Sequence, residues 1–270
     1  CDITLISVIE KDKLANPDAG GLSQEQKTAL QETEDAVIES CDEMLTEEAE
    51  RVREAGWAGR KLIRSGHPAD EIVRAATELK VNLVVVGSHG LTGIKRYLLG
   101  SVSATVLEYA HCSVMIVKGA HERRTQDDRL RILLAYDDSA SSRHAVDFCA
   151  NLPLGDQVEI TALSVLPLVT LYRQDIKQRL SWFWQQKKRA AEMALERVTK
   201  EIEWATPNVD FELRESGDVT EEILTTANTL DSDLIVVGHK GRGAIERFLI
   251  GSTTGRIAHH ASCPVLAVRS

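Results

Sequence analysis

Two patterns of apolar residues alternate along the chain. Short uninterrupted runs of β-branched residues, such as Val84–Val86 and Ile235–Val237, predict parallel strands that are covered on both faces. Between such runs, apolar residues recur every three or four positions, as from Ser23 to Gly56, and this spacing predicts amphipathic helices. Ser23 followed by Gln26 matches a capping box at the start of that helix. The alternation of strands and helices indicates an α/β fold of βαβ units with right-handed crossovers.

The predicted elements form two similar copies, whose second halves align at an offset of 151 residues. We expect domain 1 to cover residues 1–120, a polar linker to cover residues 121–129, and domain 2 to cover residues 130–270. Domain 2 is expected to contain five strands and four helices. Domain 1 has no counterpart of the segment from Leu130 to Gln157. We therefore expect the sequence to begin partway through a longer chain, with roughly 30 to 40 residues before Cys1.

One glycine pattern, Gly-x2-Gly-x9-Gly-Ser, follows an apolar strand in both copies, and 10 of the 19 residues from the strand to the serine are identical. A glycine after a strand lets the backbone turn sharply or approach a ligand closely. The Gly-Ser pairs predict helix starts, where free N–H groups and the helix dipole attract phosphate. The motif residues are Gly87, Gly90, Gly100 and Ser101 in the first copy and Gly238, Gly241, Gly251 and Ser252 in the second.

The amino-acid composition argues against several classes of protein. The 270 residues are 43% hydrophobic, which is enough for a packed core, and the net charge is −9 because 41 acidic residues outnumber 32 basic ones. An acidic chain argues against nucleic-acid binding, and no apolar run approaches the ~20 residues that span a bilayer. Five scattered cysteines without a C-x-x-C pair argue against a disulfide framework or zinc site and favour the cytoplasm.

The glycine pattern resembles the ATP-binding signature of the universal stress protein family, and the sequence is similar to a tandem-domain member over residues 2–117 and 130–269. The resemblance implies two doubly wound domains of the flavodoxin or Rossmann type. Each has a parallel five-stranded sheet in the order 3-2-1-4-5, and the first copy lacks its first strand and helix. Family members pair through their last strands, here Val114–Val117 and Val265–Val268. This implies a pseudo-dimer within one chain and leaves a homodimer open.

The resemblance also implies where ATP binds, with or without Mg²⁺. In domain 2 the carboxylate near the ribose or base falls on Asp137, Ala135 supplies backbone beside it, and Val165 packs on the base. The implied phosphate path there consists of Val237, Gly238, Lys240, Gly241, Gly251, Ser252, Thr253 and Thr254. The matching positions in domain 1 are Val8, Val86, Gly87, His89, Gly90, Gly100, Ser101, Val102 and Ser103.

Several of these residues also have a plainer interpretation. The glycines can serve only strand-to-helix turns, and Asp137 with Asp138 can serve only as turn formers. For His89 we favour a backbone contact over acid–base chemistry, and Lys240 can pair with phosphate or stay solvated. The aromatic run Trp182–Trp184, followed by three basic residues, suggests nucleic-acid binding. The acidic total instead favours a core-facing or partner-facing helix.

The predicted function is a cytoplasmic ATP-binding module of stress response or signalling, whose nucleotide occupancy shapes its conformation or its choice of protein partner. We expect no catalytic residues, because the chain has no Walker motif and no Ser–His–Asp or Cys–His grouping can be assembled from its spacing. Slow ATP hydrolysis is the most activity expected. The alternatives are an interaction module of the same fold that binds no nucleotide, and a slow ATPase.

Overall fold

The structure is a computed structural model that describes residues 2–10, 23–88, 99–119, 129–168, 174–241 and 250–269, with the backbone alone for residues 174–181. The chain divides into two compact units, residues 1–80 and 81–270. This division differs from the boundary between the sequence repeats. The end of the first repeat packs within the second unit because its last strand pairs there.

The smaller unit contains β1 (Asp2–Ile9), α1 (Gln24–Glu54), β2 (Ala58–Ser65) and α2 (Pro68–Glu78). β1 and β2 pair in parallel, and both helices pack on the pair. α1 buries Leu45 and Ala49, two residues of its predicted apolar face. The predicted capping box is confirmed, because the Ser23 hydroxyl accepts from the Gln26 N–H and the Gln26 side chain accepts from the Ser23 N–H.

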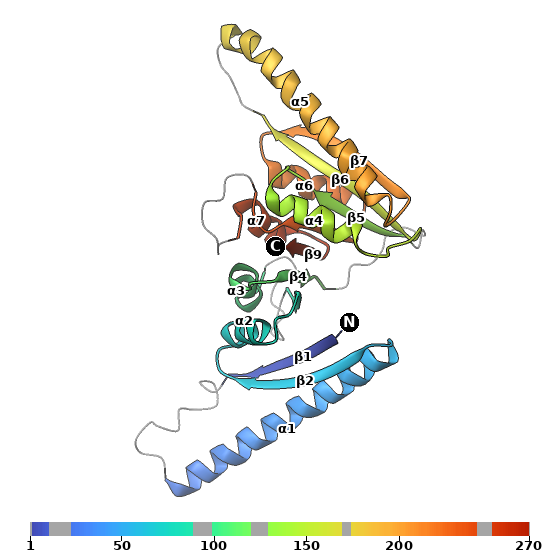
Figure 1. Ribbon diagram of the computed structural model, residues 1–270. Helices are drawn as coiled ribbons and strands as arrows, with labels where there is room; N and C mark the ends of the chain where they lie inside the picture. The colour runs from blue at the N-terminus through green and yellow to red at the C-terminus, as the bar shows by residue number, and fades with distance from the viewer. Residues whose placement is uncertain are drawn as a thin grey trace. The chain divides into compact units, whose positions relative to one another are not determined.

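The larger unit contains, in chain order, β3 (Leu83–Gly87), α3 (Ser101–Tyr109), β4 (Ser113–Val117), β5 (Leu130–Ala135), α4 (Ala140–Ala150), β6 (Val158–Pro167), α5 (Gln174–Ile202), β7 (Asn208–Ser216), α6 (Val219–Thr229), β8 (Leu234–Gly238), α7 (Ser252–His260) and β9 (Val265–Val268). Its strands form one sheet in the order β3-β4-β9-β8-β5-β6-β7 (Figure 1). Within the second repeat, all neighbouring strands are parallel and their order is 3-2-1-4-5. The described residues of this repeat show the five strands and four helices that the sequence predicts.

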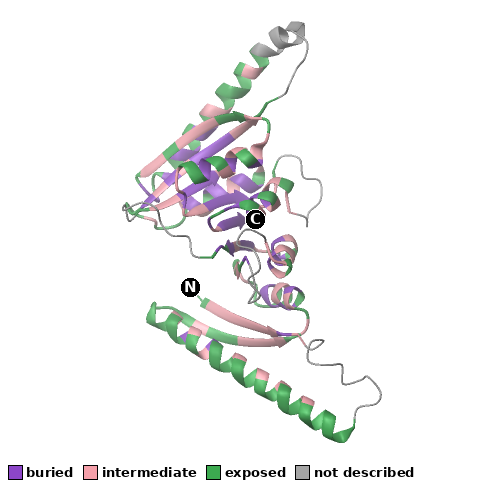
Figure 2. Cartoon of the chain, turned by 180° about the vertical axis from the view of Figure 1, so that it is seen from behind, coloured by how far each residue is buried: buried purple, intermediate pink, exposed green. Residues whose placement is uncertain are grey.

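Two helix layers cover the sheet of the second repeat. α4 and α5 pack together, as do α6 and α7, which is the doubly wound arrangement. β8 and β9 are buried over most of their length and β5 and β6 over about half of it, whereas the edge strand β7 is only partly buried (Figure 2). Among the fully buried side chains are Leu133, Ile160 and Ile235, one from each of three adjacent strands. The uninterrupted apolar run Ile235–Val237 is therefore a strand with both faces covered, as predicted.

The last strands of the two repeats pair in an antiparallel manner, as the resemblance implies. Val114 lies opposite Ala267 and Ile116 lies opposite Val265. This pairing joins the parallel pair β3-β4 to the five parallel strands of the second repeat. The prediction of one parallel sheet for the first repeat is wrong, because β1 and β2 form a separate two-stranded sheet.

One buried cation, Lys118, and one partly buried cation, Arg269, strengthen this junction in a reciprocal way. Lys118, directly after β4, donates to the carbonyl oxygen of Ala258 at 2.6 Å in the last turn of α7. Arg269, directly after β9, donates to the carbonyl oxygen of Glu108 at 2.8 Å in the last turn of α3. Each repeat thus supplies a positive charge to the helix C-terminus of the other, where unpaired carbonyl groups and the helix dipole favour a cation.

The equivalent strands β3 and β8 differ sharply in burial, and the prediction that the run Val84–Val86 is covered on both faces is wrong for β3. Val85 of β3 is 55% exposed, whereas the equivalent Val236 of β8 is 1% exposed. β8 is flanked by β5 and covered by α4, and neither has a counterpart beside β3 in the part of the chain that the structure describes.

Candidate functional site

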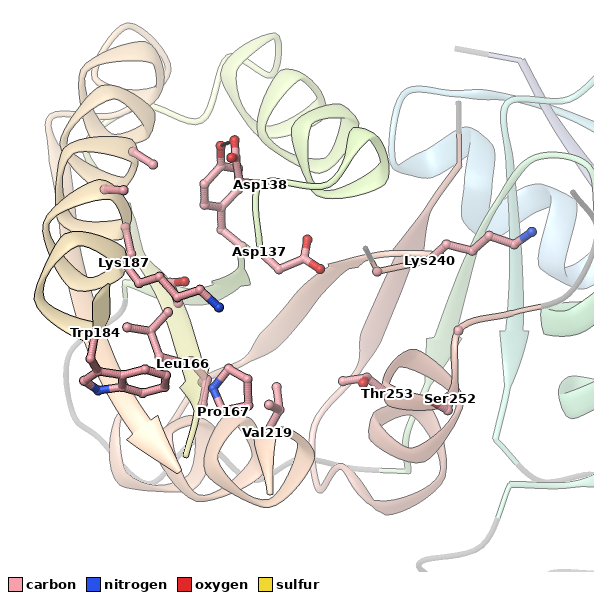
Figure 3. A pocket seen from close by; sticks show the side chains of 18 of the residues that line it. Asp137, Asp138, Leu166, Pro167, Trp184, Lys187, Val219, Lys240, Ser252 and Thr253 are labelled. Atoms are coloured by element: carbon pink, nitrogen blue, oxygen red, sulfur yellow. Dashed lines mark hydrogen bonds between the residues drawn. The ribbon is translucent and has the colours of Figure 1, made fainter. Parts of the chain in front are cut away.

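A pocket of about 1000 Å³ lies at the carboxyl ends of β5, β6 and β8 (Figure 3). The chain leaves β5 toward β6 on one side and returns through β8 on the other, so this is the switch point at which open α/β sheets bind ligands. Its lining comes from the turn after β5, the end of β6, one face of α5, and the segments around the second glycine motif. The lining residues are Tyr136, Asp137, Asp138, Ser164, Val165, Leu166, Pro167, Trp184, Lys187, Ala190, Ala191, Ala194, Val219, Lys240, Gly241, Ile250, Gly251, Ser252 and Thr253.

Asp137 combines a turn role with a place in the pocket. Its Oδ1 accepts a hydrogen bond from the Ser139 N–H at 3.1 Å, which is the turn that Asp favours. A Cβ atom at Gly241 would lie 3.0 Å from Asp137 Oδ2, so a residue without a side chain at 241 leaves this carboxylate room. The two interpretations of Asp137 from sequence, a turn former and a ligand-binding carboxylate, are therefore compatible.

The start of α7 presents backbone amides at the opposite side of the pocket. Gly251 is the N-cap residue and no side chain caps the helix. Ser252 and Thr253, in the first turn, line the pocket. The Gly251 N–H itself is not available, because it donates to the carbonyl oxygen of His239 at 2.8 Å. The amides of the first turn, rather than that of the glycine, are the ones that can bind an anion.

Four residues assigned to the domain 2 site by resemblance lie outside the pocket lining: Ala135, Val237, Gly238 and Thr254. The Thr254 hydroxyl donates to the Gly238 carbonyl oxygen at 2.8 Å and is buried, so it holds the start of α7 to the end of β8. Gly238 lies against the backbone of Ser141 at the start of α4. The other seven, namely Asp137, Val165, Lys240, Gly241, Gly251, Ser252 and Thr253, are brought together.

The domain 1 candidates do not fall within one compact unit. Val8 belongs to residues 1–80, whereas Val86, Gly87, Gly100, Ser101, Val102 and Ser103 belong to residues 81–270. His89 and Gly90 lie outside the described residues. The local pattern of domain 2 recurs here, since the Ser103 hydroxyl donates to the Gly87 carbonyl oxygen and the Gly100 N–H donates to that of Ser88 at 2.7 Å.

His239 directly follows Gly238 of the second glycine motif, and its side chain is a neutral imidazole at pH 7. Its Nδ1 lies 3.2 Å from the Ser141 hydroxyl, which joins the end of β8 to α4. Burial, together with the nearby positive charge of Arg269, lowers the pKa of His239 to about 4. A pKa below that of an ordinary histidine means that the folded protein disfavours the charged imidazolium form.

His239 is expected to make the fold sensitive to acid. The unfolded chain binds a proton near pH 6.5 and the folded chain only near pH 4, so stability is full above pH 6.5 and falls as the pH drops toward 4. Because the ring is only half-buried, we expect a loss of about 1–2 kcal/mol. Urea unfolding at several pH values should show this extra slope in the wild type and lack it in His239→Gln. The exposed His260→Gln variant should retain it, and equal slopes in all three proteins would contradict the assignment.

The α5 wall of the pocket was not predicted from the sequence. Trp184, Lys187, Ala191 and Ala194 follow one another at helical spacing and all line the cavity. Trp184 is partly buried there, whereas Trp182 is 67% exposed. The spacing was visible in the sequence, but nothing local shows which element this face of the helix meets.

Other candidate chemistry is limited within the described residues. Cys41, Cys112, Cys149 and Cys263 are free thiols, and burial raises the pKa of Cys149 to about 12. No group of three or more His, Cys, Asp or Glu side chains there has a metal-binding arrangement. The helices of the described part include none with the length and apolarity needed to cross a membrane.

These features define a doubly wound α/β protein with a ligand pocket at the switch point of its sheet. The chain belongs to the universal stress protein family, whose model matches residues 1–118 and 129–269. Both repeats are thus copies of that family's domain.

Individual relatives agree with this assignment. A universal stress protein of Mycolicibacterium smegmatis is 31% identical over 69% of this chain and 61% of its own length. One from Bacillus subtilis is 42% identical over 26% of this chain and 47% of its own length, so the aligned parts span less than two thirds of either relative. The crystal structure of a universal stress protein from Archaeoglobus fulgidus has a TM-score of 0.64 and 22% identity, and the match covers 99% of this chain and 87% of that one. At that identity the similarity shows the shared fold.

Proposed function

We propose that the second repeat binds ATP, with or without Mg²⁺, and that nucleotide occupancy sets the conformation or partner choice of a cytoplasmic stress-response module. The observation that carries the proposal is that one cavity contains Asp137, the glycines Gly241 and Gly251, and the first turn of α7. These parts suit the two ends of a nucleotide. The carboxylate of Asp137 can accept from ribose or base, and the helix start can bind phosphate.

The cavity has the size and polarity that a nucleotide requires. Its volume of about 1000 Å³ is at the upper end of small-molecule pockets. Val165, Leu166, Pro167 and Val219 offer an apolar surface for a base. Lys240 lines the pocket on the same side as Ser252 and Thr253, where the phosphates are proposed, although its side chain extends away from the cavity (Figure 3). When bound, Mg²⁺ would neutralise phosphate charge.

The test is a calorimetric titration of the purified protein with Mg-ATP. The wild type should bind saturably, and Asp137→Ala should weaken binding about tenfold, because a hydrogen bond to a charged group is lost. Asp147→Ala, which removes an exposed carboxylate of α4, serves as the matched control and should change the affinity less than twofold. Wild-type protein that binds no nucleotide would refute the proposal.

An interaction module without nucleotide is the second candidate, and one observation favours it. Gly238 packs against α4 and the Gly251 N–H is used within the fold, so both glycines have structural roles without any ligand. Chromatography of the denatured protein for co-purifying nucleotide separates the two candidates. A steady release of phosphate above the enzyme-free rate would instead identify a slow ATPase.

A further inference from the structure

We propose that α5 supplies a second wall of the nucleotide site, in which Trp184 packs on the base and Lys187 donates a hydrogen bond to the nucleoside. This inference rests on the proposed nucleotide site and adds two specificity-determining residues to it. Neither residue belongs to the glycine motif or to the strand ends. Both come from a helix whose pocket-lining face is identified only by the fold.

Trp184 is held in place before any ligand arrives. Its indole N–H donates to Glu215 Oε2 at 3.2 Å, and Lys188 donates to Glu215 Oε1 at 3.2 Å. Glu215 belongs to β7, so this pair of hydrogen bonds fixes the orientation of the ring relative to the sheet. The ring lies on the side of Leu166 and Pro167 (Figure 3). A fixed aromatic face beside apolar side chains suits a planar base, because stacking needs little rearrangement.

Lys187 lies one helical turn from Trp184 and extends into the pocket (Figure 3). The Lys187 amine lies 4.9 Å from the centre of the Phe183 ring. Among the described residues, Lys187 forms no ion pair with a carboxylate. An exposed cation–π contact is weak, about 0.5–1 kcal/mol, so a ligand acceptor can displace it. Lys187 is therefore a cation that can turn to a ligand at little cost.

The position of Lys187 decides which part of a nucleotide it meets. Figure 3 shows it on the side of Leu166 and Pro167, away from Ser252 and Thr253 at the start of α7. The phosphates are proposed to bind at the start of α7, which leaves the ribose or base for Lys187. Three alanines on the same helix, Ala190, Ala191 and Ala194, keep the space beside it open.

The first experiment measures affinities for ATP, ADP and AMP by titration calorimetry. Lys187→Met keeps the length of the side chain and removes its donor, and it should weaken binding of all three ligands by the same factor, about tenfold. Arg189→Met removes a neighbouring exposed cation that does not line the pocket and should leave all three affinities within twofold. Unchanged affinities in Lys187→Met would overturn the inference. So would a loss that shrinks as phosphates are removed, since it would place Lys187 at the phosphates.

The second experiment uses tryptophan emission during titration with ATP. Trp182 and Trp184 lie two residues apart on α5, but only Trp184 lines the pocket. Trp182→Phe should keep the ATP-induced change in emission, and Trp184→Phe should lose it. Retention of the change in Trp184→Phe would overturn the role of this ring.

Failure of this inference is distinguishable from failure of the proposed function. If the wild type binds ATP and Asp137→Ala weakens binding while Lys187→Met does not, the nucleotide site stands and the α5 wall is wrong. If the wild type binds no nucleotide, both are wrong.

Discussion

Replacing Gly251 with valine is expected to weaken ATP binding by about 100-fold or more, because the phosphate-binding turn of α7 would be blocked and two or three hydrogen bonds lost. A Cβ atom at this position would lie 3.3 Å from both the carbonyl oxygen of His239 and the Cα of Lys240. Both are backbone atoms at a distance shorter than an ordinary contact, so they must shift by a few tenths of an ångström, and the two methyl groups of valine add further bulk at the helix start. The backbone itself tolerates valine, since φ of Gly251 is −64°. Binding should therefore fall much further than stability.

The control for Gly251→Val lies four residues along the same helix. A Cβ atom at Gly255 would make an ordinary contact of 3.7 Å with Ile250, so Gly255→Ala should bind ATP almost as the wild type does. Gly100→Val makes the equivalent change in the first repeat. If ATP binding survives in Gly251→Val but disappears in the variant that carries both Gly251→Val and Gly100→Val, the ligand binds to the first repeat. Unchanged binding in Gly251→Val, Gly100→Val and Asp137→Ala would contradict the nucleotide site.

Gly238→Ala is expected to destabilise the larger unit by about 3 kcal/mol, the upper end of what an overpacked core loses. A Cβ atom there would lie 2.5 Å from the carbonyl carbon of Ser141, 2.7 Å from the nitrogen of Ser142 and 2.8 Å from the Cβ of Ser141. These are mainly backbone atoms of the first turn of α4, so no side chain can rotate away and the helix must move. In a unit of this size the melting temperature should fall by roughly 6–12 °C.

Differential scanning calorimetry of Gly238→Ala beside Gly217→Ala measures this effect. A Cβ atom at Gly217 meets nothing within 4 Å, so that variant should melt within about 2 °C of the wild type. Equal melting temperatures for both variants would show that α4 does not pack on the end of β8 as closely as the structure has it.

Local pattern was sufficient to predict individual helices and strands. The apolar run Ile235–Val237 is a buried strand, and Ser23 with Gln26 caps a helix as expected. The cap depends on residues only three positions apart, and the strand depends only on both of its faces being covered by other elements. The repeat itself, with its shared glycine spacing, was sufficient to predict the doubly wound fold and the family.

The candidate site was predicted in outline and not in detail. Asp137, Gly241 and Gly251 meet in one pocket, because parallel strands place their carboxyl ends at one edge of the sheet. The sequence did not separate Thr253, which lines the pocket, from Thr254, which bonds to the end of β8. Adjacent residues in a first helical turn point in different directions, and only the packing shows which direction faces the cavity.

By itself the sequence determined the positions of the elements, the duplication of the domain and the strand ends where polar residues and glycines gather. Only the tertiary structure decided that Trp184 and Lys187 form a wall of the pocket, and that Lys118 and Arg269 each stabilise the other repeat's helix. The reason is the distance along the chain between partners. Periodicity reports the face that a residue shares with its own helix or strand, whereas contacts between residues some 30 to 160 positions apart depend on how those elements pack.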